Sequence, residues 1–124
     1  MDTGKTSTFF QVIALMASSF DEQIRVFPPF VVIPDEIALL FDDIYRDTSQ
    51  MYQDNKLSLD SVNLLTKMND LLDNMSNDLT KWNIESLKKD ADWDTIRSLA
   101  RSILEIQGIG NEKVNFDFTH WISG

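Results

Sequence analysis

The chain contains no cysteine and only one histidine among its 124 residues. The absence of cysteine excludes disulfides, zinc–thiolate sites and thiol nucleophiles. The single histidine, His120, lies near the carboxyl end, so a catalytic triad with histidine as the base would have to include a residue of the tail. No Gly-x-Ser-x-Gly nucleophile elbow occurs either. The sequence therefore disfavours hydrolases that depend on cysteine or histidine.

Glycine is scarce, and no segment matches a phosphate-binding or metal-binding loop. Gly4-Lys5-Thr6 resembles the end of a P-loop, but no upstream glycine or strand precedes it. The acidic segment from Asp90 to Asp94 lacks the glycine and the terminal glutamate of an EF-hand loop, and the Glu-x-x-His pairs of di-iron bundles are absent. We expect no metal, no cofactor and no enzymatic activity. Carboxylates that pair in space for acid–base catalysis are the one arrangement that the sequence leaves open.

No apolar run is long enough to cross a membrane. The run from Phe9 to Ala17 is broken by Gln11, and it is too short to span a bilayer. Asp2 and Lys5 precede it in place of the basic cluster of a signal peptide. We expect this run to form a helix that is buried on most sides, in a cytoplasmic protein that does not bind membranes.

Basic residues are few: 11 Lys and Arg face 20 Asp and Glu, which gives a net charge of -9. An excess of this sign argues against binding nucleic acid through its phosphates. A basic protein is the better-matched partner. The alternative is an acidic surface that serves only solubility.

Length and patterning predict one all-α domain over residues 1–124, with five or six helices. The helices are expected at about residues 7–18, 19–27, 34–53, 58–79, 83–89 and 90–106. Ser58 and Asn83 are predicted N-caps, and Gly108 is predicted to end the last helix. Beyond Gly110, the alternation around Phe116 has the period of a strand but no partner strand, so we expect an extended tail pinned by its aromatic residues.

The segment from Pro28 to Tyr52 is predicted to organise the chain. Pro34 suits the first turn of a helix, and Asp35 and Glu36 lie where the helix dipole favours negative charge. A stripe at three- and four-residue steps is expected to face the core: Ile37, Leu40, Phe41, Ile44, Tyr45 and Tyr52. The preceding β-branched run, residues 31–33, is interpreted as an extended connector in preference to a short strand.

The helix at 58–79 has the cleanest amphipathic pattern, with one side made of Leu64, Leu65, Met68, Leu71, Leu72, Met75 and Leu79. Such a stripe of Met and Leu forms either a core face or a peptide-binding groove, and we favour the core. In the last helix, Arg97 and Arg101 lie four residues apart. We expect them to pair with Asp94 or Glu105 rather than to bind an anion.

The negative charge is concentrated in the middle of the sequence. Between Asp35 and Thr80 there are ten acidic residues and three basic ones. If the two long helices of this region pack against each other, their polar faces form one acidic patch that attracts a basic partner. The predicted partner-binding residues are Asp42, Asp43, Asp47, Asp70 and Asp73, with Tyr45 and Tyr52 as aromatic anchors.

Two segments resemble a known family. The segment Pro-Phe-Val-Val-Ile-Pro-Asp-Glu-Ile-Ala-Leu-Leu-Phe-Asp-Asp at residues 29–43 is similar to part of the small immunity proteins of bacterial contact-dependent growth-inhibition systems. The carboxyl-terminal part of those proteins is similar to a second set of residues: Trp82-Asn83-Ile84-Glu85-Ser86-Leu87, Trp93, Ile96-Arg97, Leu99-Ala100-Arg101 and Leu104.

The resemblance implies a cytoplasmic protein that binds and neutralises the toxic carboxyl-terminal domain of a delivered effector, often a nuclease. It implies no catalytic residues, because inhibition by occlusion requires none. Contact residues do not carry over, since these interfaces change with the toxin. The alternative function is that of an acidic helical adaptor or regulatory subunit of another complex.

Overall fold

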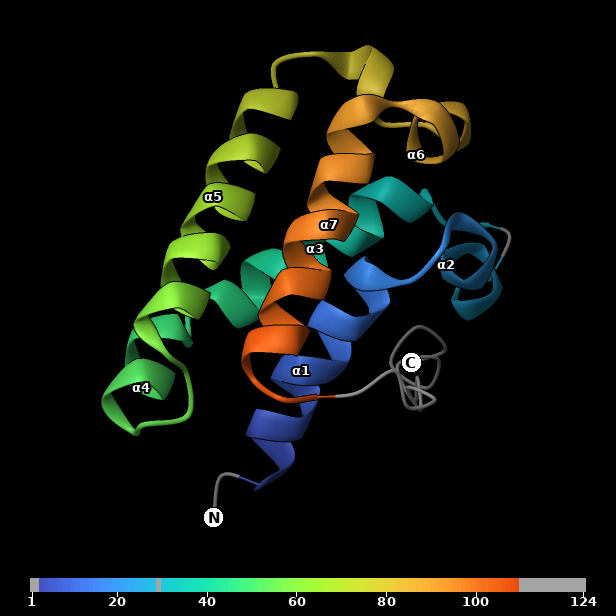
Figure 1. The fold of residues 1–124 in the computed structure, drawn as a ribbon. Coiled ribbons are helices and arrows are strands. Elements are labelled where there is room, and N and C mark those ends of the chain that lie inside the picture. Colours follow the sequence, from blue (N-terminus) through green and yellow to red (C-terminus); the bar gives the residue numbers. More distant parts are fainter. Residues whose placement is uncertain (1–2, 29, 110–124) are drawn as a thin grey trace.

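The computed structural model describes residues 3–28 and 30–109, and every regular element within them is a helix (Figure 1). In chain order these are α1 (Thr3–Ala17), α2 (Phe20–Val26), α3 (Ile33–Tyr45), α4 (Thr48–Gln53), α5 (Leu59–Met75), the 3₁₀ turn η1 (Leu79–Lys81), α6 (Ile84–Lys89) and α7 (Ala91–Ile106). The predicted all-α fold is confirmed for this part of the chain. The predicted extended tail lies outside the described residues.

Helix α7 lies between α1 and α5 and contacts both, while α3 contacts α1, α5 and α6 (Figure 1). The buried apolar residues of α7 are Trp93, Ile96, Ala100, Ile103 and Leu104. Helix α1 is buried from Val12 to Ala17, which confirms a helix covered on most sides. The buried side chains form one contiguous cluster. Its removal from water is the main favourable contribution to folding.

The helix ends follow local sequence signals. Ser19 and Glu22 form a reciprocal capping box at the start of α2. Ser58 accepts a hydrogen bond from the backbone N–H of Ser61, and Asn83 accepts one from that of Ser86, so both predicted N-caps are confirmed. After α7, Gly108 has a φ of +71°, a left-handed conformation that favours glycine and ends the helix.

The predicted helix at 34–53 is wrong in one respect: it is broken between α3 and α4. The backbone N–H of Asp47 donates to the carbonyl of Ile44, three residues back, at 2.9 Å. This tight turn coincides with Asp47, Thr48 and Ser49, whose short polar side chains compete with the helical backbone. The break raises the number of α-helices in the described residues to seven, above the predicted five or six.

Two side chains that were predicted on buried faces are exposed. Leu79 is 85% exposed, because α5 ends at Met75 and Leu79 belongs to the separate 3₁₀ turn η1. Tyr52 is 45% exposed in α4, beyond the break. Both errors arise from extending a helical period past the residue at which the helix ends.

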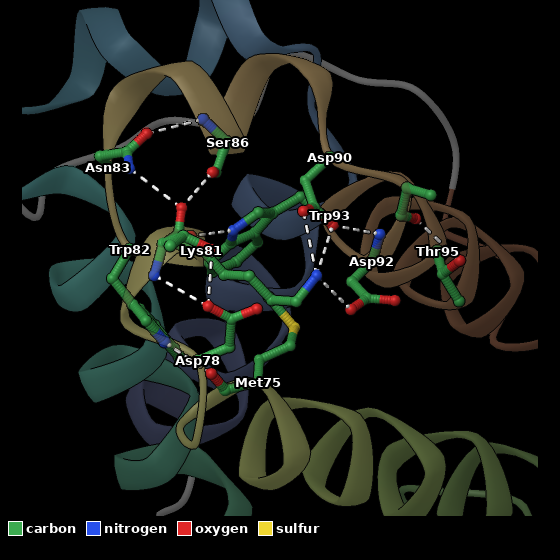
Figure 2. A network of polar contacts seen from close by, with 12 residues as sticks. Met75, Asp78, Lys81, Trp82, Asn83, Ser86, Asp90, Asp92, Trp93 and Thr95 are labelled. Carbon is green, nitrogen blue, oxygen red and sulfur yellow. Dashed lines mark hydrogen bonds and ion pairs between the residues drawn. The ribbon is translucent and has the colours of Figure 1, made fainter.

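A polar cluster joins α5, η1, α6 and α7 (Figure 2). The ammonium group of Lys81 contacts the carboxylates of Asp90 and Asp92 at 3.0 Å each. The indole N–H of Trp93 donates to the Lys81 carbonyl at 2.8 Å, and the indole N–H of Trp82 donates to the Met75 carbonyl at 2.9 Å. The two indole rings pack edge to face, with their ring centroids 5.5 Å apart. We call these residues, with Asp78, the connector cluster.

Two carboxylates of the connector cluster act as helix caps. Asp78 accepts hydrogen bonds from the backbone N–H and the hydroxyl of Thr80, and these bonds hold the pKa of Asp78 below its usual range. Asp90 accepts a bond from the backbone N–H of Asp92 at 2.8 Å, and this bond together with Lys81 lowers the pKa of Asp90. The charges of the connector cluster are therefore used within the fold.

Arg97 is also used within the fold. Its guanidinium is buried, pairs with Asp94 at 2.8 Å as predicted, and donates to the Gln23 side chain and to the Leu87 carbonyl. Burial lowers the pKa of Arg97, and Asp94 opposes that effect. Arg101 instead donates from Nε to the carbonyl of Ala17 at 3.0 Å. These bonds fasten α7 to α1, α2 and α6.

Candidate functional site

A groove of about 410 Å³ lies between α1 and α3. Helix α1 contributes Thr8 and Val12 to its lining. Helix α3 and its C-cap contribute Glu36, Leu39, Leu40, Asp42, Asp43, Ile44 and Arg46. Residues 36, 39, 40 and 43 are spaced by three, one and three, so they share one face of the helix. This face carries an acidic residue at each end and two leucines between them.

The interior of the groove is apolar. Val12 and Ile44 are buried beneath it, with 1% and 5% of their surface exposed. Leu40 is half-buried, whereas Leu39 is 62% exposed. An exposed leucine beside buried apolar residues, with charged residues before and after it on the same helix, is the composition that marks interaction sites.

Acidic groups predominate around the groove. Asp42 pairs with Arg46, four residues later, at 3.4 Å, and both side chains are mostly exposed. An exposed pair of this kind contributes little to stability and separates readily. Within the described residues, Glu36 and Asp43 have no ion pair. Two carboxylates, one at each end of the shared face, therefore remain available to a basic partner.

The negative charge of Asp43 does not stabilise helix α3. Asp35 and Glu36 lie in the first turn of α3, where the helix dipole stabilises negative charge. Asp42 and Asp43 lie near the opposite end, where the dipole disfavours negative charge, and the last turn of α3 has no basic residue. Helix stability therefore accounts for the acids at the start of α3 but not for Asp43, whereas Asp42 has Arg46 as a partner.

The predicted site residues fall into two groups. Asp42 and Asp43 line the groove, while Asp70 and Asp73 are exposed on α5, which contributes nothing to its lining. A contact joins α3 and α5 directly: the Tyr45 hydroxyl donates to that of Thr66 at 3.5 Å. The prediction that the acids of both helices serve one partner stays a prediction, and the site that the structure supports contains Asp42 and Asp43 but not Asp70 or Asp73.

The remaining predicted residues lie outside the groove lining. Tyr45 is half-buried and stacks on Phe41 with ring centroids 5.4 Å apart, so part of its surface belongs to the core. Asp47 is the N-cap of α4 and is half-buried. Tyr52 is exposed on α4. Of the two predicted aromatic anchors, Tyr52 is therefore the more accessible.

Leu39 was not predicted as a site residue. The signal was present, because Leu39 lies off the predicted core stripe and three and four residues before Asp42 and Asp43. A large aliphatic side chain on the acidic face of a helix is an exception to binary patterning. Glu36 was counted among the acids of this region but was not predicted as a partner-binding residue, since no sequence pattern indicates that α1 approaches this side of α3.

The described residues hold no group of three or more His, Cys, Asp or Glu side chains placed to bind a metal ion. Among the same residues, no helix combines the length and the apolar character needed to cross a membrane. Comparison with protein-family models, with curated proteins and with solved structures found no match. The features of the chain that bear on function are therefore the groove and the resemblance at residues 29–43.

Proposed function

We propose that the chain is a cytoplasmic immunity protein that binds and neutralises a basic toxin domain, without catalytic activity of its own. The observation that supports this proposal is the groove between α1 and α3, with its apolar interior, its exposed Leu39 and its acidic surroundings. The resemblance at residues 29–43 supports the same proposal, because that segment includes most of α3.

The mechanism follows from charge. A nuclease domain needs positive surface to hold the phosphate backbone of its substrate. An acidic protein that covers this surface excludes the substrate, and complementary charge also accelerates the encounter. The buried contact of apolar side chains in the groove then slows dissociation, since affinity among related complexes is set mostly by the dissociation rate.

The alternative proposal is an adaptor or regulatory subunit that uses the same groove for a different basic protein. The groove favours a basic partner, but its geometry does not distinguish a toxin from another protein. What separates the two proposals is the effect on the partner: an immunity protein abolishes the partner's toxic activity in a one-to-one complex.

The experiment is a calorimetric titration with the toxin domain encoded beside this gene, together with an assay of that domain's activity. We expect tight one-to-one binding, loss of activity at equimolar ratio and weaker binding at raised salt, because salt screens surface charges. Binding without loss of activity would favour the adaptor proposal. No binding to a folded, active toxin domain would contradict the immunity proposal for that pair.

A further inference from the structure

We infer that the groove binds an amphipathic helix of the partner, one with basic residues two turns apart on either side of an apolar stripe. This inference rests on the proposed function and assigns the chemistry of the segment that the site recognises. It follows from the order of residues along the groove face of α3 and from the construction of the groove walls.

The order of residues sets the pattern of the occupant. Glu36 and Asp43 are seven residues apart, which is about 10.5 Å along an α-helix. Leu39 and Leu40 lie between them, above the buried Val12 and Ile44. A helix laid along this face matches it with Lys or Arg at positions i and i+7 and with apolar residues at i+3 and i+4.

The walls favour a helical occupant over an extended one. Both α1 and α3 satisfy their backbone groups internally, so the groove is lined by side chains and offers no row of free N–H and C=O groups. An extended peptide would enter it with its own backbone groups unpaired, which is unfavourable in an apolar groove. A helix has no such penalty, and its side-chain ridges pack into the groove between two other helices.

The charges favour a basic occupant over a neutral or acidic one. Three carboxylates and one guanidinium line the groove, and Arg46 already pairs with Asp42. Glu36 and Asp43 have no ion pair within the described residues, so a basic helix adds two ion pairs without breaking one. An acidic helix would place like charges together at both ends of the face.

The test uses a fluorescein-labelled peptide of about 20 residues, long enough to form a helix. Lysines flank a leucine stripe in the pattern given above. One control peptide has the same composition in shuffled order, and a second has glutamate in place of lysine. Fluorescence anisotropy with the full chain is expected to show the amphipathic basic peptide binding about tenfold more tightly than the shuffled one. The glutamate peptide is expected not to bind.

Matched variants of the full chain test which surface binds the peptide. Glu36→Gln with Asp43→Asn removes two charges from the groove, and Asp70→Asn with Asp73→Asn removes two from α5. The first pair is expected to weaken binding about fivefold, and the second less than about twofold. Leu39→Ser, at an exposed position, is expected to weaken binding by a similar factor as the first pair. Circular dichroism verifies that each variant folds.

Several results would overturn the inference: no saturable binding of the basic peptide, equal binding of the shuffled peptide, or equal weakening by the two double variants. These outcomes are separable from a failure of the proposed function. An affinity for the toxin domain that is unchanged in Glu36→Gln with Asp43→Asn, with inhibition intact, would reject the groove as the helix site and leave the immunity proposal standing. If the chain binds the basic peptide in the groove but does not bind the toxin domain, the helix site is supported and the immunity proposal is rejected.

Discussion

The connector cluster and the groove of α3 are both rich in aspartate, yet their charges are used differently. In the connector cluster, Asp78 and Asp90 accept backbone hydrogen bonds, and Lys81 contacts Asp90 and Asp92. In the groove, Glu36 and Asp43 have no ion pair within the described residues, and Asp43 lies at the helix end that disfavours it. The number of acidic residues therefore does not distinguish a structural region from a candidate binding site. What distinguishes them is whether the acids already have partners within the fold.

The largest loss of stability is expected from a substitution in the connector cluster. Trp93 is 1% exposed and donates a hydrogen bond to the Lys81 carbonyl, so Trp93→Ala removes a buried ring and leaves that carbonyl without its partner. We expect a loss of about 3–5 kcal/mol in the free energy of unfolding, measured by urea denaturation. Leu39→Ser in the groove is the control, with an expected change below about 0.5 kcal/mol. Equal losses in the two variants would contradict the division between structural and binding regions.

A smaller loss of stability is expected from substitution of Asp90, which both caps α7 and contacts Lys81. Asp90→Ala removes both the cap of α7 and the contact with Lys81, and we expect a loss of about 1 kcal/mol in unfolding free energy. Asp90→Asn keeps an oxygen that can accept the bond from the Asp92 N–H, so its expected loss is smaller. If both variants lost the same stability in denaturant titrations, the charge and not the cap would be the dominant contribution.

The same cluster predicts how stability depends on pH. The pKa values of Asp78 and Asp90 are lowered in the folded state, so their stabilising contribution is complete above the ordinary aspartate pKa of about 4. It is lost as pH falls through the lowered values, because the unfolded state then binds more protons. We expect the unfolding free energy to fall more steeply below about pH 4 in the wild type than in Asp90→Asn. Parallel curves would show that Asp90 does not contribute.

The smallest effect on stability is expected in the groove, where it has the opposite sign. Asp43→Asn relieves an unfavourable charge at the end of α3, and we expect a gain of about 0.3 kcal/mol in unfolding free energy. Asp73→Asn is the matched control, because Asp73 is exposed near the end of α5, whose last turn also lacks a basic residue. Both variants should gain stability, while Asp43→Asn alone should weaken binding of the toxin domain. A stability loss in Asp43→Asn would remove the argument that Asp43 is kept for binding.

Much of the fold was predictable because it is encoded locally. The caps at Ser58 and Asn83 and the end at Gly108 follow from short-range hydrogen bonding and backbone conformation. The break after Tyr45 was not predictable from periodicity. Phe41, Ile44, Thr48 and Met51 are all buried, at steps of three, four and three, so the period continues through the break without a change of phase.

The candidate site was only partly predictable, because it is formed between elements that are distant in the sequence. Asp42 and Asp43 were identified from the charge distribution, and both line the groove. Glu36 and Val12 enter the site only because α1 packs beside α3. The same limit applies to Arg97, whose contact with Gln23 joins residues 74 positions apart.

The most direct test of the account uses the absence of cysteine. A single thiol is introduced at the groove by Leu39→Cys or on α5 by Asp73→Cys, and its labelling by a maleimide is timed with and without the toxin domain. Both positions are exposed in the free chain, so both thiols should react rapidly there. If the groove is the binding site, labelling at position 39 is at least about tenfold slower in the complex, and labelling at position 73 does not change. Unchanged labelling at position 39, in a complex that forms and inhibits the toxin, would contradict the assignment of the groove as the binding site.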